Sequence, residues 1–419
     1  MKKIGFLSFR LAGTDGVSLE TAKWAQVLER LGHECFYCAG ELDTPPERSH
    51  LVPRAQFKHP DIQEFYSDLF NRTQRPRHVT ARIHELREAL KREIYEFLER
   101  FSIDLLIPEN TLTIPLNIPL GLAITEVIAE TGLPTIAHHH DFYWERQRFL
   151  TNCVWDYLSS AYPPRLSVIQ HVVINSSGRN QLALRSGVNS HLIPNVMDFA
   201  NPPGDVDDYN SDLRESLGLS KEDRLILQPT RVVQRKGIEH AIELVKRLED
   251  ERAILVISHA SGDEGFEYEQ RVRSYAELLG IRALFVDERI AQARGTTTDG
   301  KKVYSLQDVY PHADLVTYPS SFEGFGNAFL EAIWHRKPLF VNNYSVYTYD
   351  IKPRGFRAAE MTDFITDGVV VETRRYLEDD EFRRETVERN YAIARRFFSY
   401  EVLESDLRHI LTEIFSVTA

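Results

Sequence analysis

Cysteine is scarce in this chain: its 419 residues include only three, Cys35, Cys38 and Cys153. So few thiols in so long a chain exclude a disulfide framework of the secreted type and favour a reducing compartment. Cys35 and Cys38 form one C-x-x-C pair on a predicted strand, where residues three apart point to opposite faces. Because the sequence contains no second such pair to complete a zinc site, we interpret all three as ordinary core or surface thiols.

Long apolar runs and an excess of positive charge are also missing. The first apolar run, residues 4–9, is too short for a signal peptide, and none approaches the ~18 residues of a membrane span. The formal net charge of −12 argues against nucleic acid as the main partner, since nucleic acid favours a basic face. The composition therefore predicts a cytoplasmic protein without a transmembrane segment or a nucleic-acid partner, and it is compatible with a homo-oligomer.

A regular alternation of strands and helices is what the chain does have. A strand at 4–9, a loop, a helix at 18–31 and a strand at 33–38 follow the order of a Rossmann-type fold. The loop lacks the G-x-G-x-x-G spacing, so a dehydrogenase-type dinucleotide site is poorly supported. The alternation restarts after an acidic break with two prolines near residue 203. The sequence therefore predicts an α/β protein with two Rossmann-like domains, residues 1–198 and 199–400, followed by a helical segment at 401–419.

A glycine-rich turn between Glu323 and Glu331 follows one predicted strand and leads into a helix near Asn327. Gly324 and Gly326 let the backbone approach a ligand closely, and the N-terminus of a helix suits phosphate. Because helical side chains tilt toward the N-terminus, Glu331 should lean toward the opening that Glu323 lines. Phosphate-binding amides beside two carboxylates suit a nucleotide sugar, since carboxylates accept hydrogen bonds from sugar hydroxyls.

A basic loop follows the strand predicted at 224–228. It carries Arg231, Arg235 and Lys236 before Gly237 begins a helix. In parallel α/β sheets, ligands bind at the carboxyl ends of the strands. Arginine and lysine at that position suit a diphosphate, and Arg235 is the weaker candidate of the three.

Three consecutive histidines, His138, His139 and His140, follow a strand predicted at 134–137. Neighbouring residues of a strand point in different directions, so such a run rarely converges on one metal ion, and we predict no metal site.

The next segment is dense in aromatic and arginine residues: Asp141, Trp144, Arg146 and Arg148 stand out. Aromatic faces suit sugar rings and guanidinium groups suit anions, so the segment suits a small carboxylated or phosphorylated sugar. The alternative is an amphipathic helix packed on the core.

These motifs together resemble those of the retaining glycosyltransferases of family 4, which have the GT-B architecture of two Rossmann-like domains facing across a cleft. Residues 323–331 match the Glu-x7-Glu motif, and residues 230–237 match the Gly-Arg-x4-Lys-Gly donor-phosphate loop, with Thr230 in place of the first glycine. The resemblance covers nearly the whole chain, most specifically residues 225–345. It implies that the first domain binds the acceptor, that the second binds the donor, and that the segment 401–419 crosses back onto the first domain.

The resemblance also implies roles for single residues. Arg231 and Lys236 would bind the diphosphate and stabilise the leaving group, while Glu323 would hold the transferred sugar. Glu331 would hold the ribose, and His140, or alternatively His139, would contact the transferred sugar. The catalytic set is then His140, Glu323, Arg231 and Lys236. Backbone contacts to the donor would come from Gly16, Gly324, Phe325, Gly326, Asn327 and Ala328. The acceptor-binding candidates are His139, Asp141, Trp144, Arg146 and Arg148.

The resemblance extends to small-solute glycosyltransferases, such as mannosylglucosylglycerate synthases that use GDP-mannose. It implies transfer of a hexose from a nucleotide diphosphate sugar to a small anionic sugar such as glucosylglycerate. The motifs require no tightly bound cofactor, and a divalent ion such as Mg²⁺ is compatible with them but not required. Alternatives on the same fold are a glucosyltransferase of the trehalose- or sucrose-phosphate synthase type, a hydrolysing sugar-nucleotide 2-epimerase and a non-catalytic sugar-nucleotide-binding protein.

Overall fold

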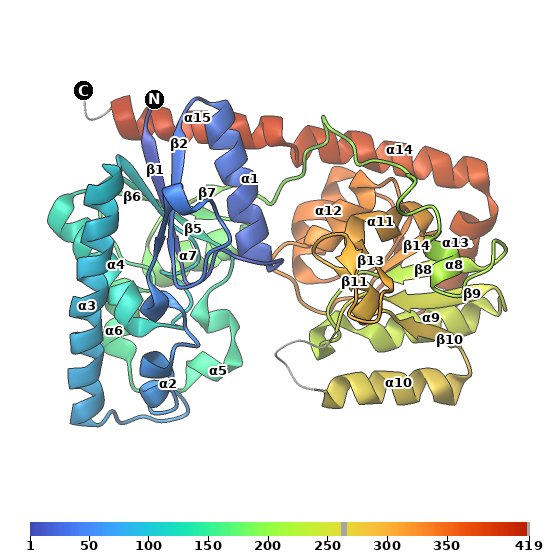
Figure 1. The fold of residues 1–419 in the computed structure, drawn as a ribbon, viewed down its shortest axis with the longest axis horizontal. Helices are drawn as coiled ribbons and strands as arrows, with labels where there is room; N and C mark the ends of the chain where they lie inside the picture. The colour runs from blue at the N-terminus through green and yellow to red at the C-terminus, as the bar shows by residue number, and fades with distance from the viewer. Residues whose placement is uncertain (261–265, 417–419) are drawn as a thin grey trace. The chain divides into compact units, whose positions relative to one another are not determined.

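The chain folds into two compact units (Figure 1). The structure is a computed structural model that describes residues 1–260 and 266–416. Unit 1 comprises Met1–Val196 together with the chain from Tyr400 onward, and unit 2 comprises Met197–Ser399. Residues 417–419 of the predicted terminal helix lie outside the described residues.

A parallel sheet forms the centre of unit 1. Among the described residues its seven strands have the order β3-β2-β1-β4-β5-β6-β7. The strands are β1 (Lys3–Ser8), β2 (Glu34–Ala39), β3 (Ser49–Leu51), β4 (Leu105–Pro108), β5 (Thr135–His139), β6 (Ile169–Val173) and β7 (His191–Leu192). The chain runs outward from β1 in one direction and then returns to add β4 on its other side. The loops after β1, β4 and β5 therefore emerge side by side, where ligands bind in such sheets.

Two apolar clusters cover the faces of this sheet. Side chains alternate along each strand, so Ile4 and Phe6 join one cluster while Leu7 joins the other. The first cluster includes side chains of α1 (Gly16–Arg30) and α15 (Tyr400–Ser416), and the second includes side chains of α3 (Arg77–Phe101) and α4 (Ile118–Thr131). Figure 1 shows the two pairs of helices on opposite sides of the sheet. Helix α15 belongs to this unit because its apolar stripe is buried against α1 and the sheet. The remaining α-helices of the unit are α2 (Pro60–Tyr66), α5 (Gln147–Leu150), α6 (Trp155–Ala161) and α7 (Ser176–Ser186).

Unit 2 is built on a second parallel sheet. In the described part of the chain its six strands have the order β10-β9-β8-β14-β15-β16. The strands are β8 (Arg224–Gln228), β9 (Ala253–Ile257), β10 (Arg282–Phe285), β14 (Leu315–Tyr318), β15 (Leu339–Asn342) and β16 (Ala359–Met361). Its α-helices are α8 (Leu213–Ser216), α9 (Ile238–Leu248), α10 (Glu267–Leu279), α11 (Leu306–Val309), α12 (Asn327–Trp334), α13 (Asp367–Glu378) and α14 (Asp380–Phe397). Strands β8 and β14 are neighbours, so the two loops with the charged motifs follow adjacent strands. The predicted fold class, two parallel-sheet Rossmann-like domains, is confirmed.

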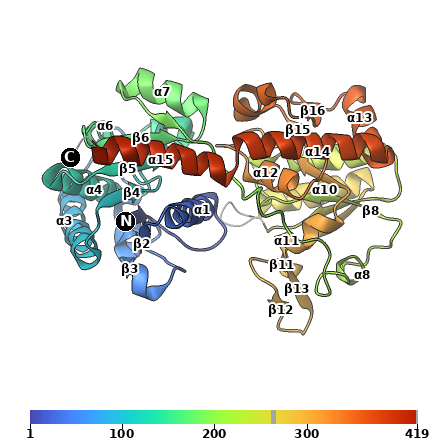
Figure 2. The same ribbon diagram turned by 90° about the horizontal axis from the view of Figure 1, so that it is seen from above.

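A small sheet that the sequence did not predict projects from unit 2 (Figure 2). It consists of β11 (Ile290–Ala291), β12 (Gly295–Thr296) and β13 (Lys302–Ser305). Strands of two to four residues are too short to show a clear alternation, which explains why the pattern alone missed them.

The boundary between the units follows Val196 rather than residue 198. The backbone N–H of Met197 already donates to Phe398, and the indole of Trp334 donates to the carbonyl of Asp198. The acidic break near residue 203 therefore belongs to unit 2, where Asp207 pairs with Arg294. No helix within residues 1–260 or 266–416 combines the length and apolarity needed to cross a membrane.

Candidate functional site

The basic loop after β8 and the glutamate loop after β14 are joined directly. The backbone N–H of Ser321 donates to the carbonyl of Arg235 at 2.9 Å. Gly237 has φ 59°, and a Cβ atom there would lie 2.6 Å from the carbonyl oxygen of Pro319. Only glycine fits this position without displacing backbone, so the two loops meet as closely as a backbone contact allows.

Glu323 and Lys236 form a buried ion pair at this junction. Glu323 is 8% exposed and also accepts from the Arg235 guanidinium at 3.0 Å. Burial opposes ionisation of Glu323, but Lys236 and Arg235 outweigh it and lower the pKa of the carboxyl below its usual value. The predicted donor loop thus brings its lysine to the predicted sugar-binding carboxylate, and Arg235, the weaker sequence candidate, joins them.

Arg231 lies exposed on the same loop, beside a histidine that the sequence did not single out. Burial lowers the pKa of His259, and the charges of Arg231 and Lys236 lower it further. His259 follows the end of β9, and its Nδ1 lies 2.7 Å from the Ser258 hydroxyl. Two cations and a neutral imidazole therefore lie close together at the carboxyl ends of adjacent strands, an arrangement suited to phosphate oxygens.

The turn before α12 is held in a conformation that requires glycine. Gly326 has φ 127°, and a Cβ atom there would lie 2.4 Å from the Tyr344 hydroxyl. That hydroxyl donates to the carbonyl of Phe325 at 2.8 Å. The helix then begins at Asn327, and the backbone N–H groups of a first helical turn suit the binding of an anion. Gly324 and Ala328 are partly exposed on either side of this turn, whereas Phe325 packs its ring against Phe398.

Glu331 lies on α12, one turn after Asn327. It accepts a hydrogen bond from the Tyr310 hydroxyl at 3.1 Å. Burial and the negative charge of Glu331 raise the pKa of Tyr310 well above its usual value, so the phenol remains a donor. This bond fixes the carboxylate while leaving Glu331 partly exposed.

The three histidines of unit 1 have different surroundings because side chains alternate along β5. His138 stacks on Trp24 with ring centroids 4.1 Å apart, and His139 bonds to His171 at 2.9 Å. Both side chains are buried, and burial lowers the pKa of each. His140 lies just beyond the strand with 10% of its side chain exposed, so it is the histidine of the three that reaches the surface of the unit.

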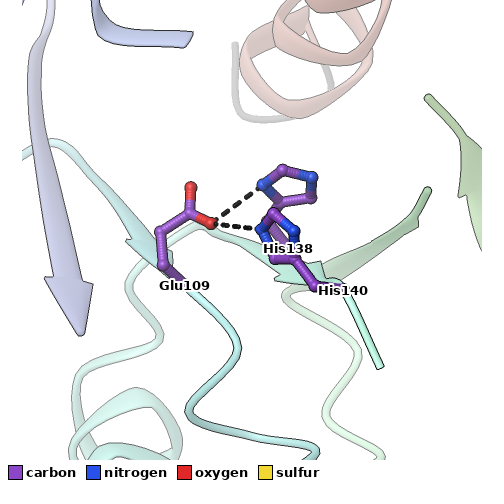
Figure 3. A group of neighbouring side chains, drawn as sticks. All are labelled: Glu109, His138 and His140. Carbon is purple, nitrogen blue, oxygen red and sulfur yellow. Dashed lines mark hydrogen bonds and ion pairs between the residues drawn. The ribbon is translucent and has the colours of Figure 1, made fainter. Parts of the chain in front are cut away.

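Glu109 joins His138 and His140 in one cluster (Figure 3). Its Oε2 lies 2.9 Å from Nδ1 of His138 and 3.3 Å from Nε2 of His140. Burial raises the pKa of Glu109 to about 7, although hydrogen bonding and charge from His140 oppose it. Burial lowers the pKa of His138 to about 4, which leaves that imidazole neutral. One carboxylate oxygen thus accepts from two neutral rings and fixes the orientation of His140.

The same three side chains bring potential metal ligands together. Their ligand atoms lie within 4.8 Å of one another, a convergence that the histidine run by itself did not predict, because Glu109 comes from another strand. A divalent cation fits this donor set by chemistry. Hydrogen bonds from both rings to one oxygen of Glu109 hold the three side chains together, so we interpret the group as a hydrogen-bonded cluster.

The aromatic and arginine segment is anchored beside this cluster. Asp141 accepts from the amide of Asn110 at 2.8 Å and forms an ion pair with Arg146. The backbone N–H of His140 donates to the side-chain oxygen of Asn110 at 3.1 Å. The segment forms a short 3-10 turn and α5 rather than one amphipathic helix.

The other predicted contact residues of unit 1 lie in contrasting positions. Trp144 stacks on Phe142 at 4.5 Å and carries the Arg185 guanidinium over its ring, so its faces are largely occupied. Arg148 is exposed. Gly16 is exposed at the first turn of α1, where the Asp15 side chain already accepts from the next two backbone N–H groups.

Several residues of these sites were not predicted from the sequence. Glu109, Asn110 and His259 each follow the end of a strand, and that position was the available signal. Tyr310 and Tyr344 carry no such signal, because they reach the motif from the segments that precede and follow it, 21 and 19 residues from their partners.

Residues 210–391 match the family model described as glycosyl transferases group 1. Among solved structures, sucrose-phosphate synthase from Thermosynechococcus elongatus superposes with a TM-score of 0.68 at 15% identity, covering 100% of both chains. At that identity the likeness concerns the fold, which is GT-B. The chain belongs to the group 1 glycosyltransferases with the GT-B fold, a family of enzymes that use nucleotide-sugar donors.

Within this family the chain is similar to two curated proteins named mannosylglucosylglycerate synthase. It is 32% identical to the protein from Thermotoga maritima over 97% of this chain and 98% of that one. It is also 32% identical to the protein from Petrotoga mobilis over 86% of each chain.

Proposed function

We propose that this glycosyltransferase transfers a hexose, with retention of configuration, from a nucleotide diphosphate sugar to a small anionic sugar. GDP-mannose is the favoured donor and glucosylglycerate the model acceptor, since both relatives are named mannosylglucosylglycerate synthase. One observation supports the donor side of the proposal. In unit 2, Lys236 forms an ion pair with Glu323, and Glu323 lies just before the first turn of α12. A cation, an anion and a helix N-terminus together match the diphosphate and the hydroxyl groups of one ligand.

Charge stabilisation is the proposed work of unit 2. Lys236 and Arg231 bind the diphosphate and stabilise the negative charge that develops on it as the sugar leaves. The backbone of Gly324, Phe325, Gly326, Asn327 and Ala328 approaches the donor. Glu331 accepts from the ribose hydroxyls, held by Tyr310. When phosphate takes Lys236 as its partner, Glu323 becomes available to accept from the hydroxyls of the transferred sugar.

Retention follows in this proposal from attack on the face that the diphosphate leaves. A donor phosphate oxygen takes the proton of the attacking acceptor hydroxyl, so no side-chain nucleophile is required. The protein then contributes position and charge rather than a covalent intermediate. Mg²⁺ beside the diphosphate is compatible with this scheme, and no step depends on it.

His140 is the proposed sugar contact of unit 1. Its Nε2 lies toward Glu109, which leaves Nδ1 for another partner. We retain His140 rather than His139, because the His139 side chain is 1% exposed and bonded to His171. Gly16 remains the proposed backbone contact of the first loop. Asp141 and Arg146 position the segment that carries Arg148, and Trp144 would contact the acceptor through the part of its side chain that stays exposed.

The experiment that tests the proposal begins with donor binding. Thermal unfolding is measured with GDP, UDP and ADP, since a ligand bound to the folded chain raises the melting temperature. GDP should give the largest shift in wild type, and Lys236→Ala should lose most of it. Lys246→Ala, an exposed lysine on α9, is the matched control and should keep the full shift.

Transfer is then followed with GDP-mannose and glucosylglycerate, and the anomeric configuration of the product is read by NMR. An α-linked product from the α-linked donor supports retention, whereas inversion would refute it. Release of GDP and free sugar without any acceptor would favour the 2-epimerase alternative. No shift with any nucleotide would favour a protein without a working donor site, and a UDP or ADP preference would refute GDP-mannose as the donor.

A further inference from the structure

A pocket of about 280 Å³ opens on unit 1 beside the arginine-rich segment. It lies between the chain that follows α2 and helix α5, which are adjacent in Figure 1. The two segments are tied together by a backbone hydrogen bond of 2.8 Å from Asn71 to Thr151 and by a bridge between Phe70 and Asn152. The lining residues are Tyr66, Ser67, Phe70, Asn71, Arg72 and Arg148.

Aromatic rings form the base of this pocket. Phe70 packs edge-on against Phe149 with ring centroids 5.0 Å apart, and Tyr66 lies 5.1 Å from Phe70. Phe149 is fully buried in the apolar cluster beneath the pocket. The base is therefore packed on a buried apolar cluster, and its apolar faces suit the carbon skeleton of a small sugar derivative.

Two guanidinium groups stand at the pocket in a chain that is acidic overall. Arg148 is exposed, lies over the Phe149 ring at 4.7 Å, and has no ion-pair partner within residues 1–260 and 266–416. Arg72 pairs with Asp68 at 2.8 Å, yet 54% of its side chain stays exposed. The local charge of these three groups is thus positive, and a guanidinium matches the two oxygens of a carboxylate or phosphate.

The pocket is continuous with the acceptor segment proposed above. Burial raises the pKa of Tyr66, while Arg148 and Arg146 act against this rise, so both guanidinium groups lie near its phenol. Arg146 is paired with Asp141, the residue that follows His140. The chain from His140 through Arg146 to Arg148 therefore links the histidine cluster to the pocket.

We propose that this pocket, through Arg148 and Arg72 above the Phe70 base, binds the anionic group of the acceptor and so selects charged acceptors over uncharged ones. The inference rests on the proposed glycosyl transfer and adds to it two residues, Arg72 and Phe70, that the sequence motifs do not mark. The group recognised is an oxyanion, which a carboxylate or a phosphate ester can supply. Arg72 and Arg148 are therefore acceptor-binding residues in this proposal and take no part in the bond-breaking step.

The test compares three acceptors with the full-length chain: glucosylglycerate, its 3-phosphate ester and uncharged glucosylglycerol. For Arg148→Ala, KM for glucosylglycerate should rise about tenfold with little change in kcat, the loss expected for one charge-assisted contact. Arg72→Ala should raise KM for glucosylglycerate less, because the ion pair with Asp68 already neutralises part of the Arg72 charge. KM for glucosylglycerol should not change in either variant.

Control variants separate charge from folding. Arg148→Lys should restore part of the loss, since it keeps the charge without the planar fork. Arg92→Ala, an exposed arginine on α3, should behave as wild type with every acceptor. A larger effect of Arg148→Ala on the phosphate ester than on glucosylglycerate would identify phosphate as the group bound, and an equal effect would identify the carboxylate.

Two results would overturn the inference and leave the proposed function standing: equal KM increases for charged and uncharged acceptors, or no increase in Arg148→Ala. If wild type transfers to none of the three acceptors, calorimetric titration of glucosylglycerate gives a readout independent of transfer. Binding that Arg148→Ala abolishes would support the pocket while the transfer proposal fails. Absence of binding to wild type would refute both.

Discussion

The two candidate sites of this protein are built in opposite ways. In unit 2, two motifs that are each continuous in sequence lie on loops after the neighbouring strands β8 and β14, and their charges pair directly. In unit 1, the cluster around His140 includes Glu109, which lies 31 residues earlier in the chain. The partners of this carboxylate are neutral imidazole rings that hydrogen-bond to it.

The two sites differ in what determines the ionisation of their buried glutamate when no ligand is bound. Glu323 is ionised because two cations outweigh the effect of burial. Glu109 has no such cation, so burial dominates and its pKa rises to about 7. The site of unit 2 is therefore expected to depend on which charges are present, and that of unit 1 on pH and hydrogen-bond geometry.

The largest effect is expected when the ion pair of unit 2 is broken. Lys236→Ala should lower kcat by on the order of 10²-fold or more, because it removes the cation that stabilises the leaving diphosphate. Steady-state kinetics with a saturating donor measures this. Lys246→Ala should retain wild-type kcat, and a Lys236→Ala enzyme with near-normal kcat would refute the assigned role.

The glycine of the motif turn tests whether shape matters as much as charge there. Gly326→Ala forces a Cβ atom against the Tyr344 hydroxyl at φ 127°, which should cost about 1–3 kcal/mol of unfolding free energy and weaken GDP binding. Chemical denaturation and thermal shift measure the two effects. The comparison variant is Gly368→Ala in α13, where a Cβ atom meets only an ordinary contact and stability should not fall.

The second glutamate of the motif should affect affinity more than rate. Glu331→Ala should weaken GDP binding about tenfold, as expected for lost hydrogen bonds to the ribose. Glu331→Gln keeps an acceptor for the Tyr310 hydroxyl and should lose less. Calorimetry with GDP gives both values, and unchanged affinity in Glu331→Ala would show that the ribose is held elsewhere.

The smallest effect, and the one specific to unit 1, is a change in the pH profile. Ionised Glu109 accepts from His140, so wild-type activity should fall as the pH drops below the Glu109 pKa of about 7 and the carboxyl takes up a proton. Glu109→Gln does not titrate, so its profile should be flatter on the acid side. Above pH 7 its activity should be about fivefold lower than wild type, the equivalent of one hydrogen bond.

The profile of kcat/KM between pH 5.5 and 9 measures this difference. An acid limb that persists unchanged in Glu109→Gln would assign that limb to another group and would remove Glu109 from the positioning of His140.

Much of the fold could be predicted because its signals are local. Predicted strands at 4–9, 33–38 and 224–228 correspond to β1, β2 and β8, and buried side chains form continuous runs in β1 and β8. The strands β11 and β12 were missed because two-residue strands carry no period. The boundary between the units lies two residues earlier than predicted, because residues 197–199 are held by backbone hydrogen bonds and ring packing within unit 2.

The sequence by itself determined the order of strands and helices and the spacing of the donor motifs, because propensity and alternation act over a few residues. That spacing indicated the family, and it predicted that four residues bind the donor: Lys236, Arg231, Glu323 and Glu331. Only the tertiary structure decided which histidine reaches the surface, that Glu109 and Tyr310 support the two sites, and that Arg72 and Arg148 share one pocket. Those choices depend on the direction in which each side chain leaves its strand and on contacts between segments far apart in the chain, which no local pattern encodes.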